Sequence, residues 1–317
     1  MRYRQLGRSG LTVSVVGLGG NNFGSRCDAT QTRAVVAAAL DAGITLFDTA
    51  DVYGHRGGSE TLLGQALRNH RDEVVVATKF GMDMGGPPQE ARASRRYVRR
   101  AVEASLRRLG FDYLDLYQQH APDRRTPIEE TLAALDELVA DGKVRYIGSC
   151  NFAAWQVVEA DWTARSQHRT VFVSAQNNYS LLERGLEEEL GPACMRYGIG
   201  VLPYWPLAGG LLTGKYKRGE PPPPRSRAAE RGLPLTDEIF DRIEALEKYA
   251  VTRGLSLLEV AVGGLAAQPA VASVIAGATR PDQVRANVTA AQWEPDPEEL
   301  DDLGKLGRPR RPHVKQL

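Results

Sequence analysis

Short apolar runs alternate with longer amphipathic segments along nearly the whole chain, and this alternation restricts the fold more than any other feature. A strand that is buried on both faces of a sheet is an almost continuous apolar run, whereas a helix that covers a sheet is apolar on one side only. The pattern therefore predicts a parallel sheet wrapped by helices. Because there are eight such runs, we expect an α/β fold with a single (β/α)8, or TIM, barrel.

The predicted strands cover residues 15–19, 45–48, 74–78, 114–118, 146–149, 171–176, 200–204 and 274–276. The predicted helices cover residues 31–42, 59–68, 94–109, 128–141, 153–165, 186–197, 237–252 and 282–291, with a further helix over residues 257–267. Residues 3–6 and 12–15 flank a turn at residues 8–10 and predict a β-hairpin. The longest irregular stretch, residues 207–235 between strands seven and eight, contains four consecutive prolines. Loops of this length are usually functional or disordered, and we expect this one to overhang the active face.

Size and charge favour one domain that acts on a small molecule. The chain has 317 residues, and we expect one domain over residues 1–317 because single β/α barrels commonly reach ~250 residues and beyond. Lys and Arg number 40 against 39 Asp and Glu, so no overall field favours nucleic acid or an anionic membrane. We interpret the arginine-rich residues 94–109 as a solvated helix face, and the basic residues 307–317 as a terminus without a binding role.

Cysteine usage and the N-terminal sequence predict a cytoplasmic protein. The three cysteines form no CxxC motif or Cys/His cluster, which argues against a disulfide framework and a zinc site. No apolar run of signal-peptide length occurs near the N-terminus, and no 18-residue apolar stretch follows it. The oligomeric state is not determined by the sequence.

Four chemically active side chains, Asp48, Tyr53, Lys79 and His120, lie at or just after the ends of predicted strands. The carboxyl ends of barrel strands meet on one face, so we expect these side chains to converge there. A buried lysine is costly unless it is paired, which makes Asp48 the expected partner of Lys79. We expect the cation to lower the pKa of Tyr53 and make it a proton donor, and the imidazole to orient a substrate carbonyl.

Other interpretations of these residues are weaker. A lone loop tyrosine or a lone core histidine is usually structural, but four suitable positions together favour a site. A metal-dependent barrel hydrolase needs several ligands on the strand ends, and of five histidines only His120 is placed there, so no metal site is predicted. No GxGxxG motif follows a strand, so a Rossmann-type cofactor site is not indicated either.

The same segments resemble the aldo-keto reductases. That family places its Asp and Tyr in DTAxxYG, its Lys in TKFG and its His after the fourth strand, and this chain has DTADVYG, TKFG and His120. The resemblance covers nearly the whole chain. It implies that the hairpin closes the barrel floor, and that the protein reduces an aldehyde or ketone with NADPH, reversibly, with Tyr53 as general acid. It also implies that NADH is at most a less preferred cofactor, and that retention of His120 goes with carbonyl chemistry.

The resemblance further implies how the cofactor is held. GSCNF at residues 148–152 is similar to the family's G-x-S-N-F, which binds the nicotinamide carboxamide, and Tyr204 matches the aromatic that stacks on the ring. Arg280 and Arg227 are candidates for the ribose 2′-phosphate, because a guanidinium can make two bonds to a phosphate at once. The complete implied set is Gly20, Asn21, Asp48, Cys150, Asn151, Gln176, Tyr204, Trp205, Pro206, Leu207, Gly209, Lys215, Arg227, Gly277, Thr279, Arg280, Gln283 and Asn287.

Three positions depart from the family pattern. Cys150 replaces a usual serine and is a weaker hydrogen-bond donor, Trp205 replaces a small residue, and Ala286 lacks the carboxylate that often precedes the asparagine. The residues expected to line the substrate pocket are Asn21, Asn22, Phe23, Tyr53, His120 and Trp205. None of them identifies a particular aldehyde or ketone.

A second function stays open from the sequence. Potassium-channel β-subunits share the barrel and bind NADP(H) chiefly as regulatory partners, so a non-catalytic NADP(H)-binding subunit is the alternative. We expect a regulatory protein to tolerate loss of site residues. All four residues of the quartet are present here, which favours the enzyme.

Overall fold

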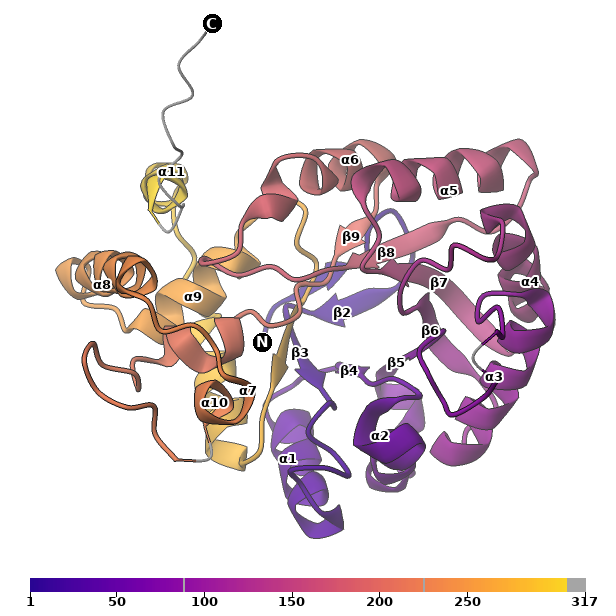
Figure 1. Cartoon of the computed structure of the whole chain (residues 1–317), viewed down its shortest axis with the longest axis horizontal. Coiled ribbons are helices and arrows are strands. Elements are labelled where there is room, and N and C mark those ends of the chain that lie inside the picture. The colour runs from indigo at the N-terminus through magenta and orange to yellow at the C-terminus, as the bar shows by residue number, and fades with distance from the viewer. Residues whose placement is uncertain (88, 225, 307–317) are drawn as a thin grey trace, which may run out of the picture.

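The computed structural model describes residues 1–87, 89–224 and 226–306. Eight parallel strands form one sheet in the order β10-β3-β4-β5-β6-β7-β8-β9, curled into a ring with the helices outside it (Figure 1). The strands are β3 Val16–Gly19, β4 Leu46–Asp48, β5 Val75–Phe80, β6 Leu114–Gln119, β7 Val144–Cys150, β8 Phe172–Gln176, β9 Gly200–Val201 and β10 Val274–Gly277. The predicted (β/α)8 barrel is therefore confirmed.

The ring is closed by hydrogen bonds that join β9 and the residues after it to β10 and the residues before it. Ala272 N donates to Val201 O, and Ile275 N donates to Pro203 O, both at 2.9 Å. The seventh strand is shorter than the predicted residues 200–204, because Pro203 has no N–H with which to continue the ladder. The third strand is longer than predicted, so Lys79 lies within β5.

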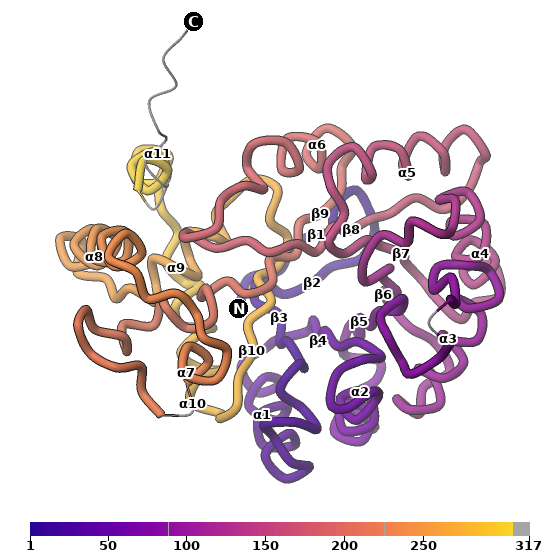
Figure 2. Tube along the Cα trace, in the orientation of Figure 1, coloured from indigo at the N-terminus to yellow at the C-terminus, as the bar shows by residue number. Residues whose placement is uncertain are grey.

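The N-terminal hairpin closes one end of the barrel. Its strands, β1 Tyr3–Gln5 and β2 Thr12–Ser14, are antiparallel and lie across the middle of the ring in Figure 2. Leu6 and Val13 of the hairpin are buried in one cluster with residues from the barrel interior, such as Leu116 and Leu202. The floor is therefore sealed by apolar contact, as the resemblance implied.

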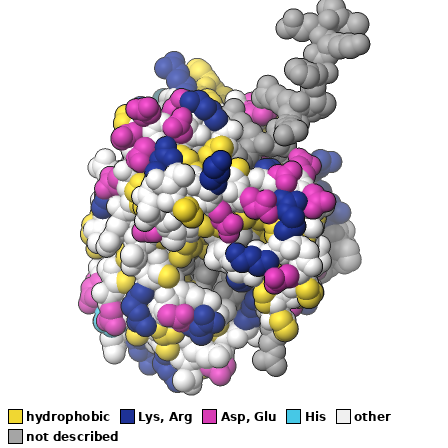
Figure 3. Space-filling model, turned by 90° about the vertical axis from the view of Figure 1, so that its left-hand side faces the viewer, with side chains coloured by type: hydrophobic (Ala, Val, Ile, Leu, Met, Phe, Trp, Pro, Cys, Tyr) yellow, Lys and Arg dark blue, Asp and Glu magenta, His cyan; other side chains and the backbone are white. Residues whose placement is uncertain are grey.

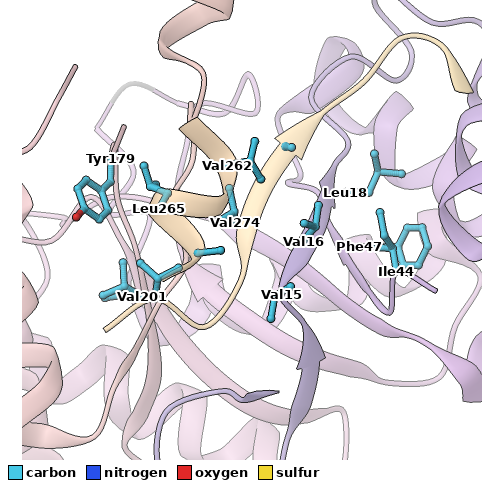
Figure 4. Close-up of a cluster of buried hydrophobic side chains, with 14 of the residues drawn as sticks. Val15, Val16, Leu18, Ile44, Phe47, Tyr179, Val201, Val262, Leu265 and Val274 are labelled. Carbon is cyan, nitrogen blue, oxygen red and sulfur yellow. The ribbon is translucent and has the colours of Figure 1, made fainter. Parts of the chain in front are cut away.

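The helices begin and end where the local sequence provides caps. Asp28 and Ser256 accept backbone N–H bonds at the starts of α1 (Ala29–Asp41) and α9 (Leu257–Ala266), and Gly110 ends α3 (Arg95–Leu109) in a left-handed conformation. The helices that cover the barrel are α1 Ala29–Asp41, α2 Tyr53–Leu67, α3 Arg95–Leu109, α4 Ile128–Ala140, α5 Ala154–Ser166, α6 Leu190–Tyr197, α8 Asp237–Thr252, α9 Leu257–Ala266 and α10 Pro281–Ala290. Figure 4 shows Val262 and Leu265 of α9 packed beside Val274 of β10.

Several short elements differ from the prediction. The stretch at residues 207–235 is not irregular throughout, because it contains η3 Ala208–Thr213 and α7 Arg227–Arg231. The segment predicted as one helix over residues 186–197 is η2 Gly185–Glu187 followed by α6, since Pro192 is tolerated only in a first helical turn. The elements η1 Arg71–Glu73 and α11 Pro297–Lys305 were not predicted.

The surface carries both signs of charge. On the side with α8 and α11, Figure 3 shows basic and acidic side chains interspersed, with no large area of one sign. Within the described residues, no helix has the combination of length and apolarity needed to cross a bilayer. The basic tail, residues 307–317, lies outside the described part of the chain.

The close approach of α2 and α3 provides a stability test. A methyl group at Gly64 of α2 would overlap the carbonyl group of Leu109 of α3, so Gly64→Ala is expected to destabilise the fold by about 1–3 kcal/mol. Gly304 of α11 is the matched control, because a methyl group there meets nothing within 4 Å. Gly304→Ala is expected to be neutral or stabilising by roughly 0.5–1 kcal/mol. Urea unfolding of both variants measures the difference, and equal stabilities would contradict the tight packing.

Candidate active site

A buried ion pair lies at the centre of the carboxyl end of the barrel. The Nζ atom of Lys79 donates to both carboxylate oxygens of Asp48 at 2.8 Å and to the carbonyl oxygen of Thr49 at 2.9 Å. Lys79 is 0% exposed. Burial acts to lower the pKa of Lys79, but the Asp48 carboxylate more than offsets this and leaves the pKa above its ordinary value. The predicted pairing is therefore confirmed, and Lys79 is charged.

Two glutamines surround the same carboxylate. Oδ1 of Asp48 accepts hydrogen bonds from Gln176 Nε2 at 2.9 Å and Gln118 Nε2 at 3.5 Å. Gln176, which was expected at the nicotinamide, thus has one amide N–H bonded to Asp48. Gln118 was not anticipated, although a strand alternates its side chains and Gln118 lies two residues before His120, on the same side of the chain. The alternation of side chains along the strand was therefore the sequence signal that could have identified Gln118 as a site residue.

Tyr53 lies between the ion pair and the histidine. Its ring centroid is 5.2 Å from Lys79 Nζ and 5.7 Å from the His120 ring, which it meets edge to face. The three N–H groups of Lys79 already have acceptors in Asp48 and Thr49, so the cation acts on Tyr53 through space. Burial raises the pKa of Tyr53 to about 12, and the Lys79 cation offsets only part of this. The expected lowering of this pKa is wrong, because loss of water around a phenolate outweighs the nearby charge.

The backbone after Tyr53 is locked in an unusual turn. Gly54, His55, Arg56 and Gly57 all have positive φ, from 61° to 116°, before the regular part of α2 begins. Such a conformation is unfavourable for non-glycine residues and persists only where the surroundings enforce it. At Gly54 a side chain would meet the carbonyl oxygen of Phe23 and the amide of Ser59. The turn therefore fixes the direction in which the chain leaves Tyr53.

His120 presents a neutral imidazole. Its backbone N–H donates to Phe80 O at 2.8 Å, which attaches it to the end of β5. Burial, and then the Lys79 cation, lower its pKa to about 3. Its Nδ1 atom is buried and has no hydrogen-bond partner within the described residues. A neutral ring can donate from one nitrogen only, so it can hydrogen-bond a carbonyl oxygen without adding charge.

Asn151 and Tyr204 form the adjoining wall. Asn151 Nδ2 donates to the His120 carbonyl oxygen at 2.9 Å, and the Tyr204 hydroxyl donates to Asn151 Oδ1 at 2.7 Å. Asn151 has a φ of 60°, a conformation that asparagine tolerates better than most residues. The Cys150 thiol accepts a weak hydrogen bond from Asn151, and burial raises its pKa to about 12, so it stays neutral.

A cavity of about 1040 Å³ opens over these residues and continues to α10. Its size is at the upper end of the range of small-molecule and cofactor sites, roughly 300–1,000 Å³. The predicted site residues on its wall are Asn21, Asn22, Asp48, Tyr53, His120, Cys150, Asn151, Gln176, Tyr204, Trp205, Pro206, Leu207, Gly209, Lys215, Arg227, Gly277, Thr279, Arg280, Gln283 and Asn287. Lys79 lies beneath it.

Besides Lys79, two predicted site residues do not reach this wall. Phe23, which was expected in the substrate pocket, is 0% exposed and belongs to the core, so that expectation is wrong. Gly20 is covered by Ser59 and Phe23, and its N–H donates to Asp48 O at 2.7 Å. An apolar residue in the first loop turns inward because burial of an aromatic ring is favourable.

The basic side chains of the cavity have different surroundings. Arg280 pairs with Asp282 at 3.1 Å, and Arg227 Nη2 donates to Asn22 Oδ1 at 3.1 Å. Arg26 forms an ion pair with Glu230, and the Arg231 guanidinium stacks 5.3 Å over Trp205. The cavity positions of Arg26 and Arg231 were not predicted, and no local pattern marks them, because the first loop and α7 meet only in the folded chain.

Comparison with known proteins agrees with this geometry. The sequence profile of the Aldo/keto reductase family matches residues 15–308. An uncharacterized oxidoreductase of Bacillus subtilis (strain 168), YrpG, is 38% identical, with 96% of each chain covered. A probable voltage-gated potassium channel subunit beta of Oryza sativa subsp. japonica is 35% identical over 98% of each chain. The L-glyceraldehyde 3-phosphate reductase of Escherichia coli (strain K12) is 35% identical, covering 92% of this chain and 87% of that protein.

Proposed function

The chain belongs to the aldo/keto reductase family, and on that premise we propose that it is an NADPH-dependent oxidoreductase that reduces an aldehyde or ketone to the alcohol. One observation carries the proposal. A protonated Tyr53 stands against a buried Lys79–Asp48 ion pair and a neutral His120, beside a cavity with enough volume for a cofactor. This set can donate a proton to an oxygen atom on which negative charge develops.

The residues on the cavity wall fit a nicotinamide adenine dinucleotide phosphate. Asn151 and Cys150 lie next to His120 and would hold the carboxamide end. Lys215 is exposed on the wall and has no ion pair within the described residues, so its ammonium is available to a pyrophosphate. Arg280, near Gln283 and Asn287 of α10, would meet the 2′-phosphate. When bound, the reduced nicotinamide supplies a hydride to the carbonyl carbon.

The chain's own residues then handle the oxygen and the proton. His120 donates a hydrogen bond to the carbonyl oxygen and directs it towards Tyr53. Tyr53 gives its hydroxyl proton to this oxygen, and the nearby Lys79 cation stabilises the phenolate that is left. Because its pKa is raised to about 12, Tyr53 is protonated at neutral pH. The site is therefore better prepared to donate a proton in reduction than to accept one in alcohol oxidation.

The second candidate is a regulatory NADP(H)-binding subunit. The name of the Oryza sativa relative, a potassium channel subunit beta, favours it. The presence of all four central residues favours the enzyme over the regulatory subunit. We propose a small carbonyl compound as its substrate and the cytoplasm as its location.

The choice between enzyme and regulatory subunit is tested by adding a panel of aldehydes, ketones, sugars and quinones to protein and NADPH and following the NADPH absorbance. Decay with one class and none with Tyr53→Phe supports the enzyme, whereas NADPH binding without decay for any class supports the subunit.

Cofactor preference is expected to depend on Arg280. Arg280→Ala removes a guanidinium that only NADPH, with its 2′-phosphate, can use, so the Kd for NADPH should rise about tenfold while that for NADH stays nearly constant. Arg227→Ala should also raise the Kd for NADPH. It should raise it further than the lost phosphate contact alone, because Arg227 also hydrogen-bonds Asn22 on the cavity wall. Arg196→Ala, an exposed change on α6, is the control. Titration of protein fluorescence measures both constants, and equal weakening of the two cofactors would remove Arg280 from the phosphate site.

A further inference from the structure

Asp51 precedes Tyr53 by two residues and lies against the outside of the barrel. The chain after β4 continues beside β5, because Thr49 N donates to Ala77 O at 2.8 Å and Asp51 N donates to Lys79 O at 3.1 Å. Side chains alternate along such a segment, so Asp48 points inward and Asp51 points outward, towards the helices. Tyr53 N donates to Ala50 O at 3.1 Å, which connects the backbone of Tyr53 to the same segment.

The Asp51 carboxyl group is buried without a partner. The residue is 2% exposed, and neither carboxyl oxygen has a hydrogen-bond partner within the described residues. The Val52 amide lies beside the group and slightly favours its charged form, but it makes no hydrogen bond of ordinary geometry. An unpaired carboxylate in such a place is too costly to persist, so the group takes up a proton.

The groups around Asp51 add to this effect. Glu60 of α2 is fully buried and accepts from Thr78 Oγ1 and Arg108 Nε, both at 2.6 Å, so the guanidinium is committed to Glu60. Within the described residues, Asp51 also interacts electrostatically with Lys79 of β5, Tyr97 of α3 and Tyr117 of β6. Burial first, and then the Glu60 charge, raise the pKa of Asp51 to about 7 against the opposing effects of Arg108 and Lys79.

We propose that Asp51 is a positioning residue for Tyr53 that works in its protonated form. While the Asp51 carboxyl group is neutral, residues 49–53 stay packed along β5. When Asp51 ionises, its charge favours hydration, and residues 49–53 move away from β5 towards water. The Ala50–Tyr53 hydrogen bond then carries the shift to the phenol, which loses its position against Lys79 and His120. Where turnover is concerned, this inference rests on the proposed reductase function.

The expected pH dependence follows from the signs of the shifts. The pKa of Asp51 is raised in the fold, so its contribution to stability is complete below its ordinary pKa of 3.8 and is lost as the pH rises towards about 7. Tyr53 and His120, with pKa values of about 12 and about 3, do not change charge near neutral pH. The part of a kcat loss between pH 6 and pH 8.5 that disappears in Asp51→Asn therefore reports on Asp51.

The test compares the wild type with Asp51→Asn, an uncharged side chain of the same shape. Wild-type kcat is expected to fall about tenfold between pH 6 and pH 8.5, while Asp51→Asn changes by less than about twofold and both keep a constant KM for NADPH. Asp112→Asn removes an exposed carboxylate before β6, at the opposite end of the barrel, and should follow the wild type. Matching pH profiles for the wild type and Asp51→Asn would overturn the proposal.

Two measurements without substrate separate this inference from the reductase function. Between pH 5 and pH 8.5 the Tm of the wild type should fall relative to that of Asp51→Asn. Over the same range the amide of Asp51 should lose hydrogen-exchange protection in the wild type, whereas residue 51 of Asp51→Asn should keep it. Both results support the positioning role even if no carbonyl compound is reduced. A uniform loss of Tm and protection in Asp51→Asn at every pH would show a merely structural residue and would also overturn the proposal.

Discussion

Tyr53→Phe is expected to lower kcat by about 10²-fold or more, because it removes the proton that the reaction delivers to the carbonyl oxygen. The ring that packs against His120 and faces Lys79 is kept, so the fold and the Kd for NADPH should change little. The raised pKa strengthens the expectation, since the wild-type phenol is protonated over the whole working pH range.

The control for this variant is Tyr113→Phe. Tyr113 lies just before β6, at the amino-terminal end of the barrel, and its hydroxyl donates to Asp72 at 3.4 Å, outside the cavity. Steady-state kinetics of the two variants with the best substrate of the panel provide the comparison. If Tyr53→Phe keeps most of its kcat, another group supplies the proton and the assignment of Tyr53 is wrong.

Lys79→Met is expected to damage both stability and activity. It leaves the Asp48 carboxylate buried without its cation, which should cost about 3–5 kcal/mol in the free energy of unfolding. The double variant Asp48→Asn/Lys79→Met removes both charges, and the glutamines that now donate to Asp48 can donate to an amide oxygen instead. Urea unfolding should therefore show that the double variant regains most of the stability that Lys79→Met loses.

The kcat/KM values of Lys79→Met, Asp48→Asn and the double variant should follow a different pattern from their stabilities. Lys79→Met removes the charge that stabilises the developing phenolate of Tyr53, whereas Asp48→Asn keeps that charge with a weaker anchor and should lose less kcat/KM. The double variant should be little worse than Lys79→Met alone, because residues that act as one unit are not additive. Fully additive losses of log kcat/KM would show two independent residues, and the role of Asp48 as the anchor of the cation would have to be abandoned.

Much of the fold followed from the sequence because the determining signals are local. Each strand is an apolar run whose boundaries can be recognised locally. The carboxyl ends of parallel strands lie on one face of the barrel regardless of the conformation of the loops. The convergence of Asp48, Tyr53, Lys79 and His120 therefore needed only the order of the strands. The Lys79–Asp48 pairing followed from the cost of an unpaired buried ammonium.

The short elements were less predictable. The segment at residues 207–235 was expected to be irregular, yet it contains α7, which is stabilised by its Ser226 cap and by its contacts with the first loop. Short helices of this kind take most of their stability from tertiary packing, which a local pattern does not contain. The inward turn of Phe23 has the same origin, since burial depends on the neighbours that the fold supplies.

The sequence by itself determined the barrel, its hairpin and the identity of the four central residues, while only the tertiary structure decided their electrostatics. The sign of the Tyr53 pKa shift depends on the balance between lost water and a cation 5.2 Å from its ring, and both quantities exist only in the folded protein. The same holds for Asp51, which looks like any loop aspartate until the fold buries it near Glu60 of α2 and Arg108 of α3. Residue type and spacing fix which groups meet, but solvation is a property of the surroundings, and a linear pattern carries no measure of it.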